Sequence, residues 1–216
     1  MTLTRREFLA AGGGTLALGC AAPQNVPMTP LSLVDTHQHL WDLDRFTLPW
    51  LKRGGEFGRT FLLKDYREAC AGTLIQKAVY MEVDVADDQK AAEADFVISL
   101  CEDAAAPTKG AVIGGRPAAP GFTDYLDRYR GVRWIKGVRQ VLNGAKPGTC
   151  LGEDFVRGIR LLGERGLCFD LCLPPDQLED AATLAERCPE TRFVLDHCGN
   201  ADPKAFAPGA KTPPDA

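Results

Sequence analysis

The chain has 216 residues, of which 45% are hydrophobic, and this is enough apolar material for one domain with a sizeable core. Its formal net charge is −4 at pH 7, and its lysines and arginines are scattered rather than arranged in a stripe. This charge pattern disfavours a nucleic-acid-binding protein, and the partner we expect on the other observations below is a small-molecule substrate.

The N-terminal residues predict an export signal. Arg5 and Arg6 form the pair of a twin-arginine motif over residues 4–9, and a short Gly-rich apolar stretch follows. That stretch is too short for a membrane-spanning helix. We expect residues 1–22 to be a signal peptide read by the twin-arginine export machinery, which would make the protein periplasmic or otherwise extracytoplasmic.

Processing of the signal has two possible routes. Gly19-Cys20 resembles a lipoprotein cleavage box, but Leu18 stands one place later than the usual pattern has it. A lipid anchor on Cys20 and ordinary cleavage near the same place therefore both stay open.

Strand and helix patterns alternate after a Pro-rich linker over residues 23–30. Apolar runs predict six strands, at 32–41, 77–84, 110–116, 132–139, 167–173 and 192–198. Helical patterns lie between them at 88–104, 122–130, 154–165 and 176–188. This alternation predicts an α/β domain over residues 31–206 with a parallel sheet of about six βα units, followed by a Pro-rich tail at 207–216. No Gly-rich phosphate or dinucleotide motif follows the first strand, which disfavours nucleotide binding.

The eight cysteines do not have the spacing of a small disulfide-stapled domain. No Cys-X-X-Cys pair occurs, and twin-arginine substrates are generally exported after folding. We therefore expect most of the thiols to be packed in the interior rather than to form a zinc cluster.

All three histidines of the chain lie at predicted strand ends. His37 and His39 are two residues apart on the first strand, so extended backbone would point both imidazoles to one face. His197 ends the sixth strand, where alternation with Phe193 and Leu195 predicts that it shares a face with core residues. Imidazole is the commonest metal ligand and a general acid or base near neutral pH. We expect the three histidines to converge as the catalytic site.

Polar residues beside these strands are further candidates. Glu82 ends the second strand and is a candidate fourth metal ligand or a residue that supports the ligands. Lys136 and Arg139 on the fourth strand are candidate substrate-binding cations, at most one of them facing inward. Trp41 is a candidate pocket wall.

Three carboxylates are expected to play supporting roles. Asp170 alternates with Cys168 and Cys172 on an apolar strand, so we expect it to orient a neighbouring Arg or His. Asp35 and Asp196 flank the histidines, and we expect both to have structural roles, Asp196 because alternation from His197 points it away.

Three motifs in this order resemble the amidohydrolase-related family (amidohydrolase 2 type), most of all its sugar-lactonase and dicarboxylate-lactonase-like branch. They are residues 35–41 (DTHQHLW), 134–139 (WIKGVR) and 194–199 (VLDHCG). The resemblance implies a (β/α)8 TIM-type barrel like those of metal-dependent hydrolases. It also implies water attack on the carbonyl of a lactone or similar cyclic ester of a sugar acid or dicarboxylate.

The resemblance leaves the role of a metal open. His37, His39, His197 and Glu82 would hold a divalent cation such as zinc, or the histidines would act without metal by hydrogen bonding to the substrate while a carboxylate takes the proton of water.

The family's later Gly-Asp-Trp-Pro-like motif, which supplies an Asp, has no counterpart here. A closed barrel of this type has eight strands and about 250 residues, so six units predict an incomplete barrel, and we expect the sequence to be a fragment. The alternatives are a metal-dependent decarboxylase or amide hydrolase on the same barrel, and an inactive remnant or ligand-binding protein.

Overall fold

The computed structural model describes residues 32–52 and 54–206. The predicted signal peptide, Cys20, the linker and the Pro-rich tail at 207–216 therefore lie outside the described residues. Within the described part, no helix is long and apolar enough to cross a membrane.

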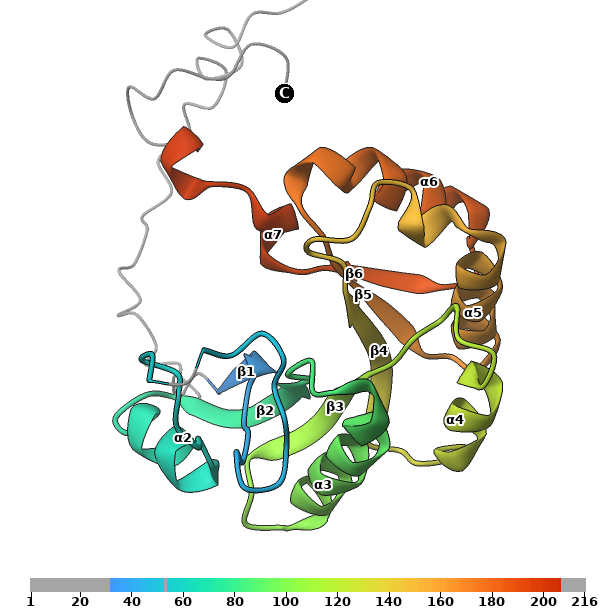
Figure 1. Cartoon of the computed structure of the whole chain (residues 1–216). Coiled ribbons are helices and arrows are strands. Elements are labelled where there is room, and N and C mark those ends of the chain that lie inside the picture. The colour runs from blue at the N-terminus through green and yellow to red at the C-terminus, as the bar shows by residue number, and fades with distance from the viewer. Residues whose placement is uncertain (1–31, 53, 207–216) are drawn as a thin grey trace, which may run out of the picture. The chain divides into compact units, whose positions relative to one another are not determined.

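A single parallel sheet forms the centre of the described domain, with its six strands in sequence order. The strands are β1 (Leu33–Gln38), β2 (Ile75–Met81), β3 (Thr108–Gly114), β4 (Ile135–Val141), β5 (Cys168–Cys172) and β6 (Arg192–Leu195). Figure 1 shows the sheet curling, with helices along its outside. The predicted incomplete TIM-type barrel of six βα units is confirmed as a half-barrel.

The helices cover the convex face of the sheet. The longer ones are α2 (Leu63–Ala69), α3 (Lys90–Glu102), α4 (Phe122–Arg128), α5 (Glu153–Glu164) and α6 (Leu178–Arg187). Short 3-10 turns occupy Asp87–Gln89, Thr149–Leu151, Pro175–Gln177 and Pro203–Phe206, and a four-residue turn, α7, spans His197–Asn200. The four predicted helices are confirmed as α3 to α6, whereas α2 was not predicted because it buries none of its residues and so has no apolar stripe.

The core lies between the sheet and these helices. Helix α5 buries Phe155, Ile159 and Leu162 on the stripe that the sequence pattern predicts. The ring of Phe155 meets that of Phe169 on β5 edge to face, with centroids 5.7 Å apart. Each such fully buried side chain stabilises the fold by roughly 1.5–3 kcal/mol, which is how the outer helices hold the curl of the sheet.

Strand β6 follows the predicted alternation at Phe193 but ends before His197. Phe193 pairs in register with Phe169 and packs near it on the helix side, with ring centroids 6.4 Å apart. Val194 pairs with Asp170, which belongs to the inner face together with Arg139 of β4. Phe193 thus packs against core residues as expected, but the expectation that His197 shares its face is wrong, because β6 ends at Leu195 and alternation from Val194 points Asp196 toward the inner face.

The cysteines are free thiols throughout the described part of the chain, and four of them are buried. They are Cys70, Cys101, Cys150, Cys168, Cys172, Cys188 and Cys198. Cys101 and Cys188, for example, are almost wholly inaccessible. This agrees with packing as the main role of the thiols.

Candidate active site

The curl of the sheet brings the ends of its two outermost strands together. His37 and His39 lie at the end of β1, and His197 follows β6, five strands away in the order of the sheet. The His37 ring centroid is 4.8 Å from that of His39 and 4.6 Å from that of His197. The three imidazoles therefore meet at the carboxyl ends of the strands, the end at which barrels of this kind carry their chemistry.

His197 reaches this place through a tight left-handed turn rather than through a longer strand. Strand β6 ends at Leu195, and His197, Cys198, Gly199 and Asn200 all have φ between 50° and 70°. Left-handed backbone costs a residue with a Cβ about 1–2 kcal/mol, so neighbouring contacts must hold the turn. The Gly199 amide donates to the Asp196 carbonyl at 2.9 Å, and the Asn200 Nδ2 donates to the Leu173 carbonyl at 2.8 Å.

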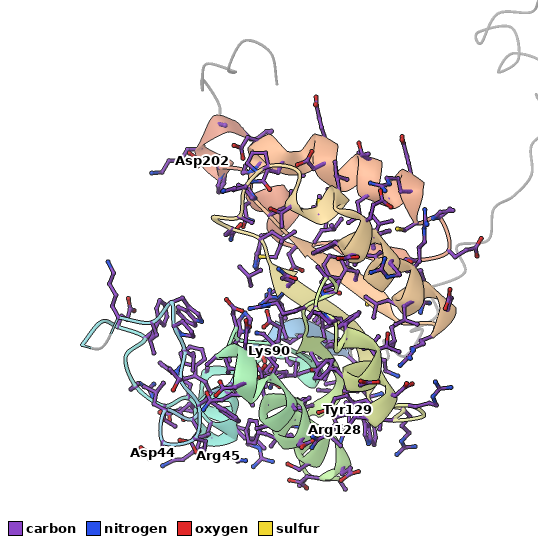
Figure 2. The ribbon with its side chains drawn as sticks, turned by 45° about the vertical axis from the view of Figure 1, so that its right-hand side comes forward. Asp44, Arg45, Lys90, Arg128, Tyr129 and Asp202 are labelled. Atoms are coloured by element: carbon purple, nitrogen blue, oxygen red, sulfur yellow. The ribbon has the colours of Figure 1, made fainter. Side chains whose placement is uncertain are left out.

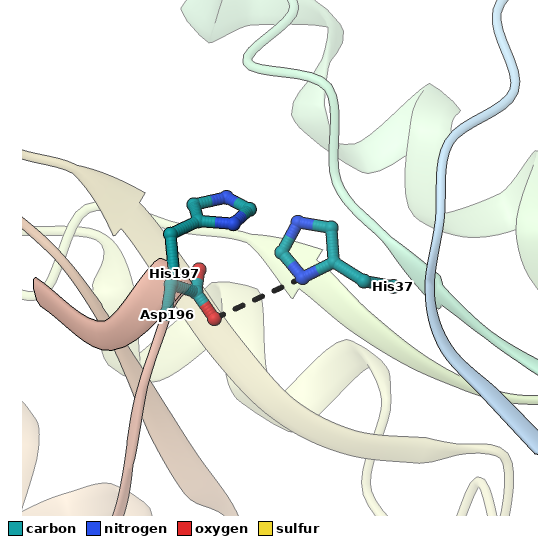
Figure 3. Close-up of side chains that lie close together, drawn as sticks. All are labelled: His37, Asp196 and His197. Carbon is teal, nitrogen blue, oxygen red and sulfur yellow. Dashed lines mark ion pairs between the residues drawn. The ribbon is translucent and has the colours of Figure 1, made fainter. Parts of the chain in front are cut away.

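Asp196 belongs to the site, which corrects the expectation that it points away. Its side chain is buried, and its Oδ2 accepts a hydrogen bond of 2.9 Å from Arg139 Nη1. Its Oδ1 lies 3.9 Å from His37 Nδ1, the pair joined by the dashed line in Figure 3. The signal that could have found this is Phe193: its large apolar side chain packs on the helix side, and alternation from it faces Asp196 inward.

Arg139 is buried beside the histidines, and its strong hydrogen bonds are to other residues of the protein. Only 4% of it is exposed, and besides Asp196 it donates from Nε to Glu82 Oε1 at 2.8 Å and from Nη2 to the Glu82 carbonyl at 2.7 Å. Its Nη1 also lies 3.5 Å from His37 Nε2. Arg139 thus fixes two carboxylates, and substrate binding by its guanidinium stays a prediction.

Glu82 is fully buried and turned toward Arg139. Its second oxygen accepts the Asp84 amide at 2.8 Å. The structure thus places Glu82 as a support of the site, the second of its two predicted roles, and not among the ligating atoms.

Lys136 lies apart from the histidines. It sits at a register shift near the start of β4, is exposed, and donates from Nζ to the Arg133 carbonyl at 2.7 Å. It lines a different cavity of about 1010 Å³ that contains none of the three histidines. The prediction that Lys136 binds substrate beside them is not supported by this position.

The protonation of His39 is set by its surroundings. Its Nδ1 donates to the Met81 carbonyl at 2.9 Å, since that oxygen can only accept, and Nε2 is left as the free nitrogen. Burial, helped by the positive charge of Arg139, lowers the pKa of His39 to about 4. His39 is therefore a neutral imidazole with an unprotonated Nε2 at neutral pH.

His37 is also biased toward the neutral form. Burial lowers its pKa below the usual 6.5, although the Asp196 carboxylate opposes the shift and Arg139 reinforces it. A neutral ring is the form that binds a metal ion or accepts a proton.

Asp170 lies beside this group without a bond to an Arg or His among the described residues. Its Oδ1 accepts from the Cys168 thiol at 3.4 Å, although β-sheet register places it next to Arg139. Burial, together with the nearby Asp196 carboxylate, raises the pKa of Asp170 to about 6. Asp35, by contrast, accepts from the Tyr66 hydroxyl of α2 at 2.9 Å, as expected for a structural residue.

A cavity of about 590 Å³ opens over the site and has an aromatic wall. Trp41 is buried in that wall, and its Nε1 donates to the Arg59 carbonyl at 2.7 Å. Trp50 and Phe57 were not predicted as site residues. The Trp50 Nε1 donates to the Val83 carbonyl at 2.7 Å while 48% of the residue stays exposed, so its ring is anchored with a free face.

The described residues contain one group with the composition of a metal site. His37, Asp196 and His197 each offer a ligand atom, and these atoms lie within 4.8 Å of one another. Two imidazoles and one carboxylate form a donor set used for catalytic zinc. His39 and Glu82, the other predicted ligands, lie outside this group, although His39 lines the same cavity and keeps Nε2 available.

Known proteins resemble the part of the chain that forms the half-barrel and carries the three histidines. A family model for amidohydrolases (Amidohydro_2) matches residues 34–215. The uncharacterized protein y4mH of Sinorhizobium fredii is 28% identical over 190 residues, which cover 80% of this chain and 64% of that protein. Amidohydrolase 2 from Bifidobacterium longum subsp. infantis is also 28% identical, with a TM-score of 0.60 and coverage of 79% and 63% of the two chains.

Two further solved structures share the fold. An amidohydrolase from Burkholderia multivorans with bound zinc has a TM-score of 0.66 at 24% identity, with coverage of 78% of this chain and 58% of that one. A probable 2-pyrone-4,6-dicarboxylic acid hydrolase from Acinetobacter baumannii with citric acid bound has a TM-score of 0.61 at 14% identity, with coverage of 81% and 61%. The chain thus spans about three fifths of the length of these relatives. The family model covers the half-barrel together with all three histidines, and the chain accordingly belongs to the amidohydrolase family.

Proposed function

We propose that the protein is a hydrolase that opens a lactone or a similar cyclic ester. The observation that carries the proposal is the convergence of three imidazoles and the Asp196 carboxylate under a cavity with an aromatic wall. The probable 2-pyrone-4,6-dicarboxylic acid hydrolase from Acinetobacter baumannii supports this choice of substrate class, because a 2-pyrone is a cyclic ester.

His37, Asp196 and His197 are the residues that would hold a divalent cation such as zinc. A zinc ion supplies a Lewis acid that polarises a carbonyl and lowers the pKa of water. The zinc-containing relative from Burkholderia multivorans supports this assignment. Arg139 would keep the Asp196 carboxylate in one orientation, because its Nη1 occupies Oδ2 and leaves Oδ1 toward His37.

His39 has a different task in this proposal. With Nδ1 donating to Met81, the unprotonated Nε2 accepts a hydrogen bond from the attacking water and orients it. The exposed faces of Trp50 and Phe57 would receive the flat face of a ring-shaped substrate, while the anchored Trp50 Nε1 keeps the indole in place.

The test is a hydrolysis assay on the zinc-loaded full chain, with a panel of pyrone carboxylates and sugar lactones. We expect ring opening for at least one member, and loss of about 100-fold or more in rate for His197→Ala, since one positioned electrostatic group is typically worth that much. Lys136→Ala is the matched control and should retain the rate. No ring opening in the presence of zinc would overturn the proposed activity of this chain.

We also propose that residues 1–22 direct export through the twin-arginine route, as Arg5 and Arg6 suggest. Replacing both arginines with lysine should leave the precursor in the cytoplasm on cell fractionation. Cys20→Ala should additionally release a membrane-bound form if the cysteine carries lipid. Normal export of the lysine variant would contradict the assignment.

A further inference from the structure

A buried carboxyl of the helix layer lies directly behind the site. Glu93 belongs to α3 and is only 1% exposed. Its Oε1 accepts two hydrogen bonds, from the Tyr80 hydroxyl at 2.9 Å and from the Val83 amide at 2.8 Å. Its Oε2 is buried without a hydrogen-bond partner among the described residues. Burying a polar atom without a hydrogen-bond partner costs stability, so the carboxyl at this position needs an explanation.

Gly114 is the point where this carboxyl approaches the inner face of the sheet. A Cβ at Gly114 would lie 3.0 Å from Glu82 Oε2 and 3.4 Å from both Glu93 Oε2 and Lys90 Nζ. Lys90, labelled in Figure 2, is held by the Val85 carbonyl at 3.1 Å and by Asp84 at 3.2 Å. The absence of a side chain at Gly114 thus lets a helix residue and an inner-face carboxylate lie close together through the sheet.

The hydrogen bonds of Glu93 lead to the site in two steps. The Val83 amide that it binds belongs to the peptide group of Glu82, whose carbonyl and Oε1 both accept from Arg139. The remaining strong contact of Arg139 is with Asp196. The Glu82–Val83 peptide and Arg139 thus form a continuous hydrogen-bonded path from Glu93 to the Asp196 carboxylate.

We propose that Glu93 is a positioning residue of the metal site, which acts by fixing the Glu82–Val83 peptide and, through Arg139, the orientation of Asp196. This inference rests on the proposed function in one respect, the binding of a cation by His37, Asp196 and His197. The contacts on which it depends lie wholly within the described residues.

Glu93 fixes the peptide as a hydrogen-bond acceptor, a role that does not require a negative charge. Burial and the neighbouring Glu82 carboxylate raise the pKa of Glu93 to about 7, against a smaller opposing effect of Lys90. A glutamine at this position keeps an oxygen that accepts from Tyr80 and Val83 and replaces the protonated oxygen with an amide. Glu93→Gln should thus preserve the site, whereas Glu93→Leu removes the acceptor and leaves the Val83 amide unpaired.

The experiment compares zinc affinity in the full-length chain by competition with a chelating dye, below the pKa of Glu93. We expect Glu93→Leu to weaken zinc binding by about 10- to 100-fold, as loss of a residue that supports metal ligands commonly does. Glu93→Gln should bind zinc as the unmodified protein does. Glu102→Leu, on an exposed position of the same helix, is the matched control and should also be unchanged.

A second readout separates this inference from the proposed function. In the metal-free protein, the ring nitrogen NMR signals of His37 should shift in Glu93→Leu but not in Glu93→Gln or Glu102→Leu, because only the first releases Asp196 from its present orientation. If the unmodified protein binds no zinc, the proposed metal site fails, and the NMR comparison still decides the role of Glu93.

A milder variant keeps the inference testable if Glu93→Leu fails to fold. If Glu93→Leu does not fold, Tyr80→Phe removes one of the two donors to Oε1 and should give a smaller shift of the same kind. Equal zinc affinity and equal His37 signals in every folded variant would overturn the inference and leave Glu93 as a packing residue.

Discussion

Arg139 is the residue on which the geometry of the site depends most. It pairs with two buried carboxylates, Glu82 and Asp196. Among the described residues these carboxylates have few other hydrogen-bond donors, such as the Asp84 amide that donates to Glu82. A buried ion pair is not by itself a large source of stability, but removing one partner leaves an uncompensated charge. Substitution of Arg139 should therefore lower the free energy of unfolding far more than substitution of an exposed arginine.

We therefore predict that Arg139→Met lowers the free energy of unfolding by about 3–5 kcal/mol, measured by urea denaturation. Arg128→Met, which breaks an exposed pair with Asp95, should change it by less than about 1 kcal/mol. Similar small effects in both variants would contradict the view that the two carboxylates depend on Arg139.

Glu93 gives a prediction for the pH dependence of stability. Its pKa is raised from 4.5 to about 7 on folding. A carboxyl shifted upward contributes its stability fully below the unfolded pKa and loses it as the pH rises through the folded pKa. Between those two values the free energy of unfolding should fall by an amount on the order of 3 kcal/mol relative to Glu93→Gln, which does not titrate. Parallel urea midpoints of the two proteins across this range would refute the shift.

At the residue scale, the sequence predicted the histidines and the supporting role of Glu82, and missed that Asp196 belongs to the site. His37 and His39 could be found because a two-residue spacing on a strand has one geometric meaning. Asp196 was misassigned because the inward face of β6 was inferred from His197, which lies beyond the end of the strand and does not follow its alternation. Trp50 and Phe57 lie on a loop, where neither periodicity nor spacing indicates what a side chain faces.

The turn after β6 is the element that delivers His197. Its backbone is left-handed throughout, and Gly199 packs so closely that an added Cβ would lie 2.8 Å from Leu178 Cδ2. Two independent penalties therefore apply to a substitution there: backbone strain and steric overlap.

We predict that Gly199→Ala destabilises the protein more than Gly144→Ala does. Gly144 has a similar φ of 85° but no atom within 4 Å of the added Cβ, so it reports the backbone penalty of about 1 kcal/mol alone. The excess for Gly199→Ala, measured by urea denaturation, is the cost of the contact with Leu178. Equal losses in the two variants would show that the turn relaxes freely.

At the scale of elements, strands and helices with a buried face were predictable. Strand β5 and helix α5 carry apolar patterns that burial imposes, and both occur within a residue or two of their predicted positions. Helix α2 and the end of β6 were not predictable, because α2 buries nothing and the turn after Leu195 is stabilised by contacts remote in sequence.

The half-barrel as a whole has two unpaired edges among the described residues. Val34 on β1 is 50% exposed and Leu195 on β6 is 47% exposed, and neither strand pairs on its outer side. Edge strands with exposed apolar side chains and free backbone groups favour association with another chain.

We predict that this 216-residue chain, produced alone, self-associates as its concentration rises. Val34→Lys together with Leu195→Lys should reduce the association without unfolding the protein, since both side chains are already half exposed and charged edges oppose pairing. Sedimentation velocity over a range of concentrations measures this. A monomer at every concentration would contradict the prediction.

At the scale of the molecule, the site exists because the sheet curls. Six strands in sequence order bring His197 back to His37, although no hydrogen bond joins β1 to β6 among the described residues. The order and direction of the strands followed from the alternation of patterns, whereas the amount of curl depends on how the helices pack and could not be derived from them.

The proposed metal site is tested most directly by X-ray absorption spectroscopy of zinc bound to the full chain at one ion per molecule. We expect nitrogen and oxygen ligands at about 2.0–2.2 Å, and loss of this signal in Asp196→Ala but not in Cys198→Ser. A sulfur ligand at about 2.3 Å, or an unchanged spectrum in Asp196→Ala, would show that the ion is held elsewhere and would contradict the site formed by His37, Asp196 and His197.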